Sequence, residues 1–333
     1  MKKFLIFRTD RVGDFILSCI LIKSIKRNKP DSEITVICSE QNYEYVKNYS
    51  LVDNAELYPK KIRKKISFFH SIIKSNFDCI LSLDGKKRSI FACVISKAKL
   101  KIISVTKKIY KKIFFNFKDN ILFIKDFRSR IEEFKFILRK IDIDYSDKDL
   151  DIFDSEKIKS NLDIINKIPE KSFYHLHLDE KWITEAYRGR RKSRNFKPIN
   201  ASIVQMCGFI EEFVTRSKKD LVISAGAETN SLIDGVKEKF NKNSTFAINN
   251  KKIIILDNLS FTDLKLIIKK AELVIACHGS PAHIASSFNT KIIDIFDKKN
   301  EEFYKFYTHH LRNYKYLYRE DFTILSKNIL QLV

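Results

Sequence analysis

Short runs of apolar and β-branched residues alternate along the chain with longer segments in which apolar residues recur at helical spacing. In the first half, the apolar runs predict strands at Lys3–Arg8, Glu33–Cys38, Ala55–Tyr58, Asp78–Leu83 and Lys101–Val105. The helical segments between them are Asp14–Arg27, Tyr43–Asn48, Lys60–Lys74 and Lys86–Lys97. This alternation is typical of a parallel α/β sheet, so residues 1–150 are predicted to form one Rossmann-like domain.

The periodicity fades between about residues 142 and 171, and residues 151–171 are predicted to be an interdomain linker. The pattern then returns, with strands at Ser172–Leu178, Leu221–Ser224, Ile253–Leu256, Leu273–Ala276 and Lys291–Ile295. The later helices are Ala201–Ser217, Asn230–Phe240, Phe261–Lys270, Pro281–Phe288 and Thr323–Leu332, the last left free to pack back on the first domain. Residues 172–333 are thus predicted to be a second doubly wound domain, with a ligand cleft between the two at the carboxyl ends of strands.

Composition indicates a folded and strongly basic protein. The 333 residues carry 63 Lys plus Arg against 41 Asp plus Glu, a net charge of +22. Average usage would supply about 23 glycines, whereas this chain has 7, so the positions that keep a glycine mark places where the backbone needs one. An apolar content of 44% argues against global disorder.

The cysteines and the N-terminus predict a cytoplasmic protein. The six cysteines show no paired spacing, which argues against disulfides and a zinc site. The apolar run after Lys3 breaks at Arg8, too early for a signal peptide. No apolar run approaches the roughly 18 residues needed to span a bilayer. A basic protein can still bind the anionic cytoplasmic face of a membrane.

The turn after the first strand, Phe7–Phe15, holds one glycine and lacks the G-x-G-x-x-G pattern of a dinucleotide site, which disfavours an NAD oxidoreductase. Gly13 would allow close backbone approach. Asp14 has two compatible interpretations: the N-cap of the next helix, or a general base facing the cleft. A second strand-to-helix turn holds Asp84 and Gly85, a common type of turn.

Three further strand ends carry polar residues in the second half. They are HLHLDEKW at 175–182, SAGAETN at 224–230 and CHGSPAHIA at 277–285. In the last, Ser280 is a candidate cap, with Pro281 in the first helical turn. A glycine-containing turn that opens a helix suits an anion such as phosphate.

No metal site is predicted. His278 and His283 lack a third ligand at suitable spacing. The D-x-D pairs Asp142/Asp144 and Asp149/Asp151 match the pattern of metal-dependent sugar transferases, but their place in the predicted linker favours solvated acidic residues.

Basic clusters occur at Lys60–Lys65, Lys107–Lys112 and Arg188–Arg194. Each is compatible with a solvated surface. The first leads into ISFFHSII, and a basic stretch with apolar neighbours can lie on a membrane interface.

Together these residues resemble the heptosyltransferase family, glycosyltransferase family nine. Residues 4–42, FLIFRTDRVGDFILSCILIKSIKRNKPDSEITVICSEQN, resemble the family's opening strand, R-x-D-x-x-G-D turn, helix and second strand. Residues 50–58 (SLVDNAELY) and 77–99 (FDCILSLDGKKRSIFACVISKAK) resemble its next two strands and a helix. Residues 259–296 (LSFTDLKLIIKKAELVIACHGSPAHIASSFNTKIIDIF) resemble its Asp-Ser/Thr-Gly-Pro-x-His-x-Ala motif. The resemblance implies a GT-B fold of two Rossmann-like domains facing a cleft.

The family's residue roles are implied position by position. Asp14 becomes the catalytic base, in the turn with Gly13. Lys181 matches the lysine that meets the nucleotide-sugar phosphates, and Glu228 the acidic residue near the nucleoside. The family motif covers the last set of donor-site positions, His278, Gly279, Ser280, Pro281 and His283. His278 departs from the family because a carboxylate that helps hold the donor sugar is expected there.

The implied activity is an inverting, metal-independent transfer of a sugar, with ADP-heptose as the expected donor substrate and no cofactor. The expected acceptor is the anionic lipopolysaccharide core or a related envelope glycan, which would bring the protein to the inner membrane surface. One alternative is a relative that binds a nucleotide-sugar or glycan without turnover, as the departure at His278 would suggest. A remote alternative is a basic nucleic-acid-binding protein, which no nucleic-acid motif supports.

Overall fold

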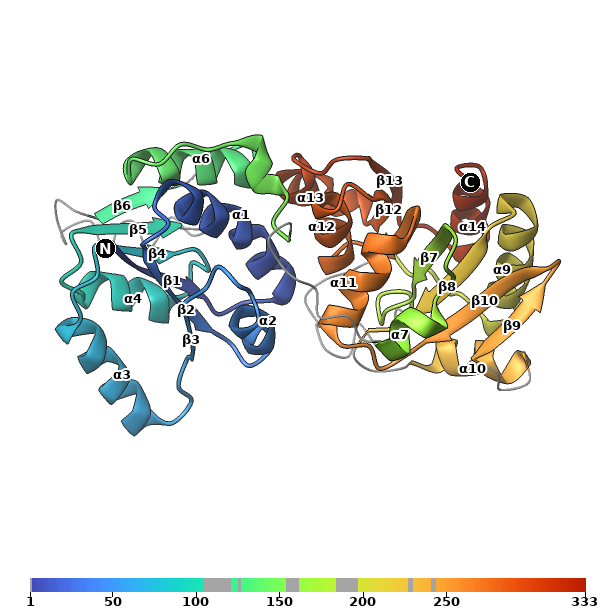
Figure 1. Cartoon of the computed structure of the whole chain (residues 1–333), viewed down its shortest axis with the longest axis horizontal. Helices are drawn as coiled ribbons and strands as arrows, with labels where there is room; N and C mark the ends of the chain where they lie inside the picture. The colour runs from blue at the N-terminus through green and yellow to red at the C-terminus, as the bar shows by residue number, and fades with distance from the viewer. Residues whose placement is uncertain are drawn as a thin grey trace. The chain divides into compact units, whose positions relative to one another are not determined.

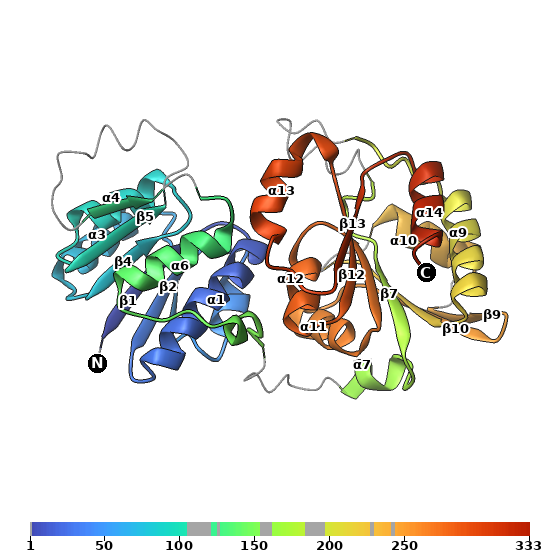
Figure 2. The same cartoon turned by 90° about the horizontal axis from the view of Figure 1, so that it is seen from above.

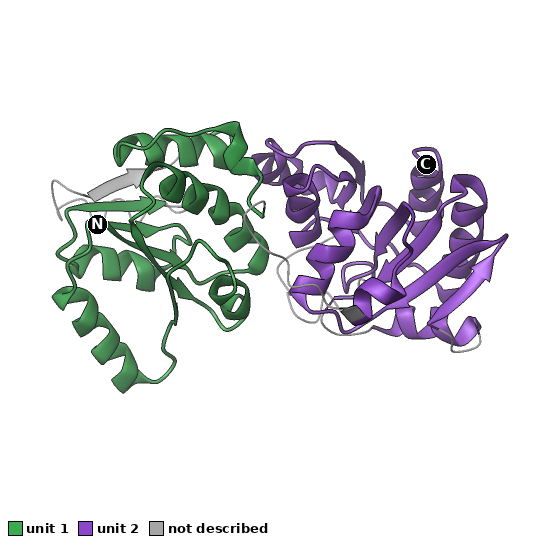
Figure 3. Ribbon diagram, in the orientation of Figure 1, with its two compact units in different colours: residues 1–156 green, residues 157–333 purple. Residues whose placement is uncertain are grey.

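The computed structural model of the chain describes residues 2–104, 121–124, 127–153, 162–183, 197–226, 230–240 and 244–333. The chain forms two compact units, Met1–Glu156 and Lys157–Val333 (Figure 3). Each unit is a mainly parallel sheet with helices on its faces (Figures 1 and 2). The α/β class expected from the alternation of the sequence is therefore confirmed.

The first unit contains a six-stranded sheet in the order β3-β2-β1-β4-β5-β6, with all neighbours parallel. Its strands are β1 (Lys3–Arg8), β2 (Glu33–Cys38), β3 (Asn54–Leu57), β4 (Cys79–Ser82), β5 (Leu100–Ser104) and β6 (Ile121–Ile124). The central strands are almost wholly buried, as expected for a parallel sheet covered on both faces. The first five follow the predicted runs closely, whereas β6 was not predicted.

The helices of the first unit lie between these strands. They are α1 (Val12–Asn28), α2 (Tyr43–Lys47), α3 (Ile62–Lys74), α4 (Lys87–Ile95) and α6 (Arg130–Lys140). Apolar residues fill most of α1, because this helix is buried along much of its length. Sequence periodicity missed α6, although Ser129 caps it by accepting a hydrogen bond from the backbone N–H of Glu132.

The prediction of solvated acidic residues is wrong for Asp149, whereas Asp142 and Asp144 are exposed. Asp149 is fully buried at the one-turn 3₁₀ helix η1 (Asp147–Leu150). Its Oδ1 lies 2.8 Å from Nε of Arg27, and its Oδ2 accepts a 2.7 Å hydrogen bond from Ser24 of α1. The Asp149 carboxylate anchors this segment on α1 through these bonds, which a buried carboxylate requires.

The second unit contains a seven-stranded sheet in the order β13-β12-β11-β7-β8-β10-β9. Its strands are β7 (Phe173–His177), β8 (Asp220–Ser224), β9 (Thr245–Ile248), β10 (Lys251–Leu256), β11 (Leu273–Cys277), β12 (Lys291–Phe296) and β13 (Tyr314–Tyr318). Only the β9–β10 pair is antiparallel among the described pairs, joined through Asn249 and Asn250, which both have positive φ. Such residues suit a tight hairpin, which explains the unpredicted edge strand β9.

The helices of the second unit are α7 (Leu162–Lys167), α9 (Ile203–Ser217), α10 (Ser231–Lys239), α11 (Phe261–Lys270), α12 (Ser280–Ser287), α13 (Glu301–Thr308) and α14 (Phe322–Leu330), with the short η2 (Lys298–Asn300). Reciprocal capping boxes start α9 and α11, from Ser202 with Gln205 and from Ser260 with Asp263. These caps explain why both helices begin where the sequence predicts.

The last helix belongs to the core of the second unit. Phe322, Leu325 and Ile329 of α14 are buried in the same cluster as residues of α9, and Phe322 meets Phe209 edge to face. The apolar face of this helix is therefore used within the second unit.

All six cysteines are buried thiols that are not joined in disulfides. Within the described ranges, the structure contains no helix of the length and apolar character required to cross a membrane.

Candidate active site

The predicted base region lies where the strand order of the first sheet reverses. From β1, the chain continues to β2 on one side, while β4 pairs with the other side of β1. Ligands of open α/β sheets bind outside the carboxyl ends of strands at such a switch point. The segments that follow β1 and β4 meet here, since Asp84 Oδ2 accepts hydrogen bonds from the backbone N–H and the hydroxyl of Thr9.

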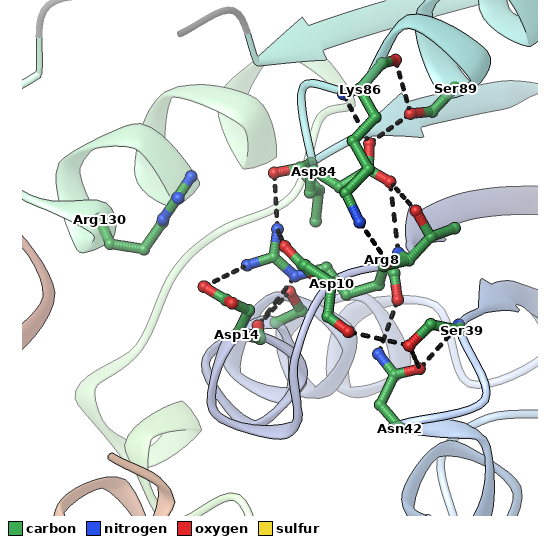
Figure 4. Close-up of polar contacts among 12 residues, drawn as sticks. Arg8, Asp10, Asp14, Ser39, Asn42, Asp84, Lys86, Ser89 and Arg130 are labelled. Carbon is green, nitrogen blue, oxygen red and sulfur yellow. Dashed lines mark hydrogen bonds and ion pairs between the residues drawn. The ribbon is translucent and has the colours of Figure 1, made fainter. Parts of the chain in front are cut away.

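Arg8, the last residue of β1, organises this turn. Its side chain is 1% exposed. Nε donates to the carbonyl oxygen of Asp14 at 2.9 Å, and Nη1 donates to that of Leu83 at 2.6 Å. The guanidinium faces two carboxylates, Asp10 Oδ2 at 3.3 Å and Asp14 Oδ1 at 3.6 Å (Figure 4). A buried guanidinium bonded to backbone on both sides is held in one orientation.

Asp14 is in the first turn of α1, and its side chain is 29% exposed. The N-cap interpretation is wrong, because Arg11 occupies the cap, Gly13 lies inside the helix and Asp14 is the third helical residue. A carboxylate there still interacts favourably with the positive end of the helix dipole. The alternative, a base with access to solvent, stays a prediction that this geometry permits.

Asp10 is the most perturbed carboxyl group in the turn. Burial, opposed by Arg8 and reinforced by the charges of Asp14 and Asp84, raises its pKa to about 6. Its Oδ1 is buried without a hydrogen-bond partner. A buried carboxyl group with a raised pKa of this kind is typical of functional sites.

The Asp84 turn is locked by its own hydrogen bonds. Its Oδ1 accepts from the backbone N–H of Lys86 at 3.2 Å and from the hydroxyl of Ser89 (Figure 4). Gly85 has φ 57°, the left-handed conformation that favours glycine. Lys86 Nζ donates to the carbonyl of Thr9. The sequence alone indicates only a common type of turn, yet this turn holds the Thr9–Asp10 backbone in place.

The predicted phosphate site lies at the corresponding switch point of the second sheet, between β7 and β11. Lys181, in the turn after β7, directs Nζ to the carbonyl oxygens of Cys277 at 3.2 Å and His278 at 3.0 Å, at the end of β11. It also pairs with Asp179. Burial alone would lower the pKa of Lys181, but the Asp179 carboxylate outweighs it and raises the pKa above its usual value. The ammonium group is therefore charged at neutral pH.

Gly279 brings the start of α12 close to this ammonium group. It is the N-cap of α12, and a Cβ placed on it would lie 2.9 Å from Lys181 Nζ. The prediction that Ser280 caps the helix is wrong, because the cap position is Gly279, without a side-chain cap bond, and Pro281 is within the first turn. The structure thus brings Lys181 to a helix N-terminus, an arrangement that suits an anion.

His278 is held from behind by groups that the sequence did not point to. Its Nδ1 lies 2.7 Å from Oδ2 of Asp294 on β12, and the hydroxyl of Tyr314 on β13 donates to the same oxygen at 3.0 Å. The Asp294 side chain is fully buried. A charged residue inside the apolar run KIIDIF was the available signal.

His283 is buried inside α12 and stacks on His310, with ring centroids 6.0 Å apart. Burial lowers the pKa of His283 well below its ordinary value. Among the described residues, no three His, Cys, Asp or Glu side chains are placed to hold a metal ion. The HLHLDEKW histidines are also structural, since His175 and His177 both contact the hydroxyl of Ser224, at 2.7 and 2.9 Å.

Arg319, which follows the unpredicted strand β13, ties these turns together. It is 4% exposed and bonds to the carbonyl oxygens of Lys181 and Lys197 and to Sγ of Cys277. Sequence reasoning missed it because no motif surrounds it.

Some predicted residues lie outside the described part of the chain. These are Glu228 and the basic clusters Lys107–Lys112 and Arg188–Arg194.

Comparison with known proteins extends over the whole chain. No family model matches it. It is 25% identical over 355 residues to lipopolysaccharide heptosyltransferase 1 of Campylobacter coli, covering 99% of this chain and 98% of that protein. Among solved structures, a glycosyl transferase family 9 protein from Veillonella parvula shares the fold with TM-score 0.64 and 12% identity, over 100% of this chain and 90% of that one.

Two other solved structures share this fold, although their names give them different reactions. The E. coli heptosyltransferase WaaC with ADP-2-deoxy-2-fluoro heptose has TM-score 0.65 and 10% identity, over 99% of this chain and 100% of that one. The UDP-GlcNAc 2-epimerase from Methanocaldococcus jannaschii has TM-score 0.57 and 13% identity, over 99% and 92%. The fold alone therefore does not select a reaction.

Two doubly wound units, with polar clusters at both switch points and this full-length match, define a glycosyltransferase with the GT-B fold. The resemblance seen in the sequence is confirmed: the chain is similar over its full length to a lipopolysaccharide heptosyltransferase, and it shares the fold of solved heptosyltransferases and of a glycosyl transferase family 9 protein.

Proposed function

We propose that the chain transfers a heptose from ADP-heptose to the lipopolysaccharide core or a related envelope glycan, with inversion and without a metal ion. The full-length likeness to a lipopolysaccharide heptosyltransferase supports the reaction class. A structural relative solved with an ADP-heptose analogue supports the donor. The observation that carries the proposal is Asp14, a partly exposed carboxylate oriented beside Arg8 at the switch point of the first sheet.

Asp14 would act as the general base. A base must lie within about 2.6–3.2 Å of the hydroxyl proton that it removes. Arg8 fixes the backbone of Asp14 through its carbonyl oxygen and faces its carboxylate. The acceptor hydroxyl then attacks the anomeric carbon, the bond to the diphosphate breaks, and Asp14 takes the proton.

The second unit would bind the donor. The nucleoside diphosphate gains negative charge as it leaves. Lys181 and the backbone N–H groups of Gly279 and Ser280 would meet that charge, since the ammonium group lies at the N-terminus of α12. The ion pair between Lys181 and Asp179 keeps the lysine charged and ready before the donor binds.

A transfer assay with ADP-heptose and a heptose-deficient core acceptor, run with a chelator present, tests this proposal. Asp14→Asn should abolish transfer, whereas ADP binding measured by calorimetry should be unchanged. Asp31→Asn, at an exposed position of the same unit, is the matched control and should transfer normally. Wild-type rates from Asp14→Asn would refute the base assignment, and loss of transfer with the chelator would refute metal independence.

A protein that binds a nucleotide-sugar without turnover is the second candidate, favoured by His278 in place of the family's carboxylate. It would bind ADP-heptose with normal affinity and transfer nothing to any core acceptor. A glycolipid acceptor would in turn place the working enzyme at the cytoplasmic face of the inner membrane.

A further inference from the structure

Helices α3 and α4 carry an apolar surface that extends outward from Phe69, which packs on the core of the first unit. Ile62 and Ile66 of α3 are 70% and 66% exposed, and Phe91 of α4 is 45% exposed. Ile62, Ile66 and Phe69 recur at helical spacing and so share one face of α3. Phe69 meets Phe91 edge to face, with ring centroids 5.1 Å apart. We call these four residues the α3–α4 surface.

A different face of α3 holds the helix on its unit. Ile72 is 3% exposed in the core cluster beneath it, and the Phe68 ring packs edge to face on Tyr58, with centroids 5.5 Å apart. Because Phe68 and Ile72 already make the contacts with the core, Ile62 and Ile66 are not needed there. Large exposed apolar side chains next to one another commonly mark an interaction site.

The α3–α4 surface lies in a strongly basic environment. Residues 60–77 and 86–99 contain no Asp or Glu. The side chains of Lys61, Arg63 and Lys64 are exposed around Ile62. Lys60 pairs with Glu40, but both side chains are largely exposed, at 75% and 62%, so this pair is weak. This charge favours a partner of negative charge.

The mixture of aliphatic and basic side chains identifies the kind of partner. Nucleic acids stack their bases on aromatic rings and gain little from exposed isoleucines. An anionic bilayer takes both features: aliphatic groups enter the boundary between headgroups and acyl chains, and Lys and Arg approach the anionic headgroups. At 13 residues, α3 suits a helix lying along the membrane surface rather than one crossing it.

We propose that the α3–α4 surface docks the protein on an anionic lipid bilayer, with Ile62 and Ile66 inserted at the interface and the neighbouring Lys and Arg side chains on the headgroups. This inference does not depend on the proposed reaction. Docking and catalysis therefore fail or succeed separately.

Co-sedimentation of the full chain with vesicles tests the proposal. Wild-type protein should bind vesicles of phosphatidylcholine mixed with phosphatidylglycerol, bind phosphatidylcholine alone weakly, and be released by salt. Ile62→Ser/Ile66→Ser should lower partitioning roughly ten-fold or more, because it removes the inserted groups. Val204→Ser, at a 74% exposed apolar position on α9, is the matched control and should bind like wild type.

The charge contribution is tested separately with Lys61→Gln/Lys64→Gln, which should reduce the preference for anionic vesicles. All these positions are exposed, so thermal unfolding should be unchanged. The proposal is overturned if wild type ignores anionic vesicles, if it binds both vesicle types equally, or if Ile62→Ser/Ile66→Ser binds like wild type. A wild-type dimer in buffer that Ile62→Ser/Ile66→Ser dissociates would also overturn it, by making this surface an interface between copies.

Discussion

The Nδ1 atom of His278 lies 2.7 Å from Oδ2 of Asp294, whose side chain is fully buried on the neighbouring strand. A carboxylate only accepts hydrogen bonds, so Nδ1 is the donor and Nε2 is left to contact other groups. The carboxylate that the family places at the end of β11 is thus replaced by an imidazole with a carboxylate directly behind it. This pair explains how a histidine is tolerated at that position.

Restoring the family's residue should therefore harm this protein. His278→Asp would place a second carboxylate beside buried Asp294, and two neighbouring carboxylates repel each other. We expect a loss of about 2 kcal/mol or more in the free energy of unfolding at neutral pH. Urea denaturation measures it, and stability should recover as the pH is lowered, because protonation of one carboxyl group removes the repulsion. His278→Asp/Asp294→Asn should recover much of the loss, and equal stability of wild type and His278→Asp would contradict the argument.

Asp10 should make the first unit less stable at neutral pH than it could be. Its pKa rises from 3.8 to about 6 on folding, chiefly through burial, so the folded state binds this proton more tightly. The resulting cost is absent below the unfolded pKa, grows as the pH rises, and is complete above about pH 6. Asp10→Asn removes this cost and should raise stability at neutral pH by about 1–3 kcal/mol.

The measurement is the urea midpoint of wild type and Asp10→Asn across this pH range. The two proteins should converge near pH 4 and separate as the pH approaches 7. Asp31→Asn, an exposed control in the same unit, should show no such divergence. A variant less stable than wild type at neutral pH would show that the ion pair of Asp10 with Arg8 outweighs its burial.

Gly279 should be required for the position of Lys181. An alanine Cβ would lie 2.9 Å from Nζ, so the flexible lysine must move away from the N-terminus of α12. If that ammonium group binds a diphosphate, Gly279→Ala should raise the Kd for ADP roughly ten-fold, the effect of losing one charge-assisted contact. Calorimetric titration measures it, with Gly208→Ala as the control because a Cβ there meets no atom within 4 Å. Unchanged ADP affinity would exclude Lys181 from the phosphate site.

Asp149 should stabilise the first unit although it belongs to a D-x-D pattern. Asp149→Ala removes the acceptor for Ser24 and Arg27 and should cost about 2–3 kcal/mol, the lower end for a buried pair because the Arg27 side chain is 38% exposed. Burial raises the pKa of Asp149, but the hydrogen bonds from Arg27 and Ser24 lower it by more, so the folded pKa lies below the usual value. Its stabilisation is therefore present above the unfolded pKa and lost as the pH falls through the lower folded value.

Thermal or urea unfolding at neutral and acid pH checks this prediction. Asp144→Ala is the control, because the Asp144 side chain is exposed and only its carbonyl oxygen accepts from Arg27. Equal stability of the two variants would contradict this prediction and would support the interpretation of Asp149 as a solvated linker residue.

Much of the fold could be predicted because local pattern and tertiary context agree in buried parallel strands. The predicted Lys3–Arg8 and Glu33–Cys38 are the observed β1 and β2, and the predicted Phe261–Lys270 is α11. Two of the missed elements have uneven burial. β9 and β13 are exposed or half-buried edge strands, and their side chains carry little hydrophobic signal.

The sequence could predict which residues of the candidate site follow a strand, but not which of them contact one another. Asp14, Lys181 and Gly279 follow apolar runs, so their approximate place could be read directly. The contact between Lys181 and the β11 carbonyl oxygens joins residues 96 and 97 positions apart, which no local pattern encodes.

The sequence by itself determined the order of the buried strands and of most helices, and with it the turns that carry the polar residues, because apolar periodicity and chain direction are local properties. Only the tertiary structure decided which charged and polar groups contact one another. Asp294 lies behind His278 because parallel strands place distant residues side by side. Arg8 faces Asp10 and Asp14 because its guanidinium is also bonded to the carbonyl oxygen of Leu83, 75 positions away. Burial then sets their energetics, since a charge removed from water depends on the partners that the fold supplies.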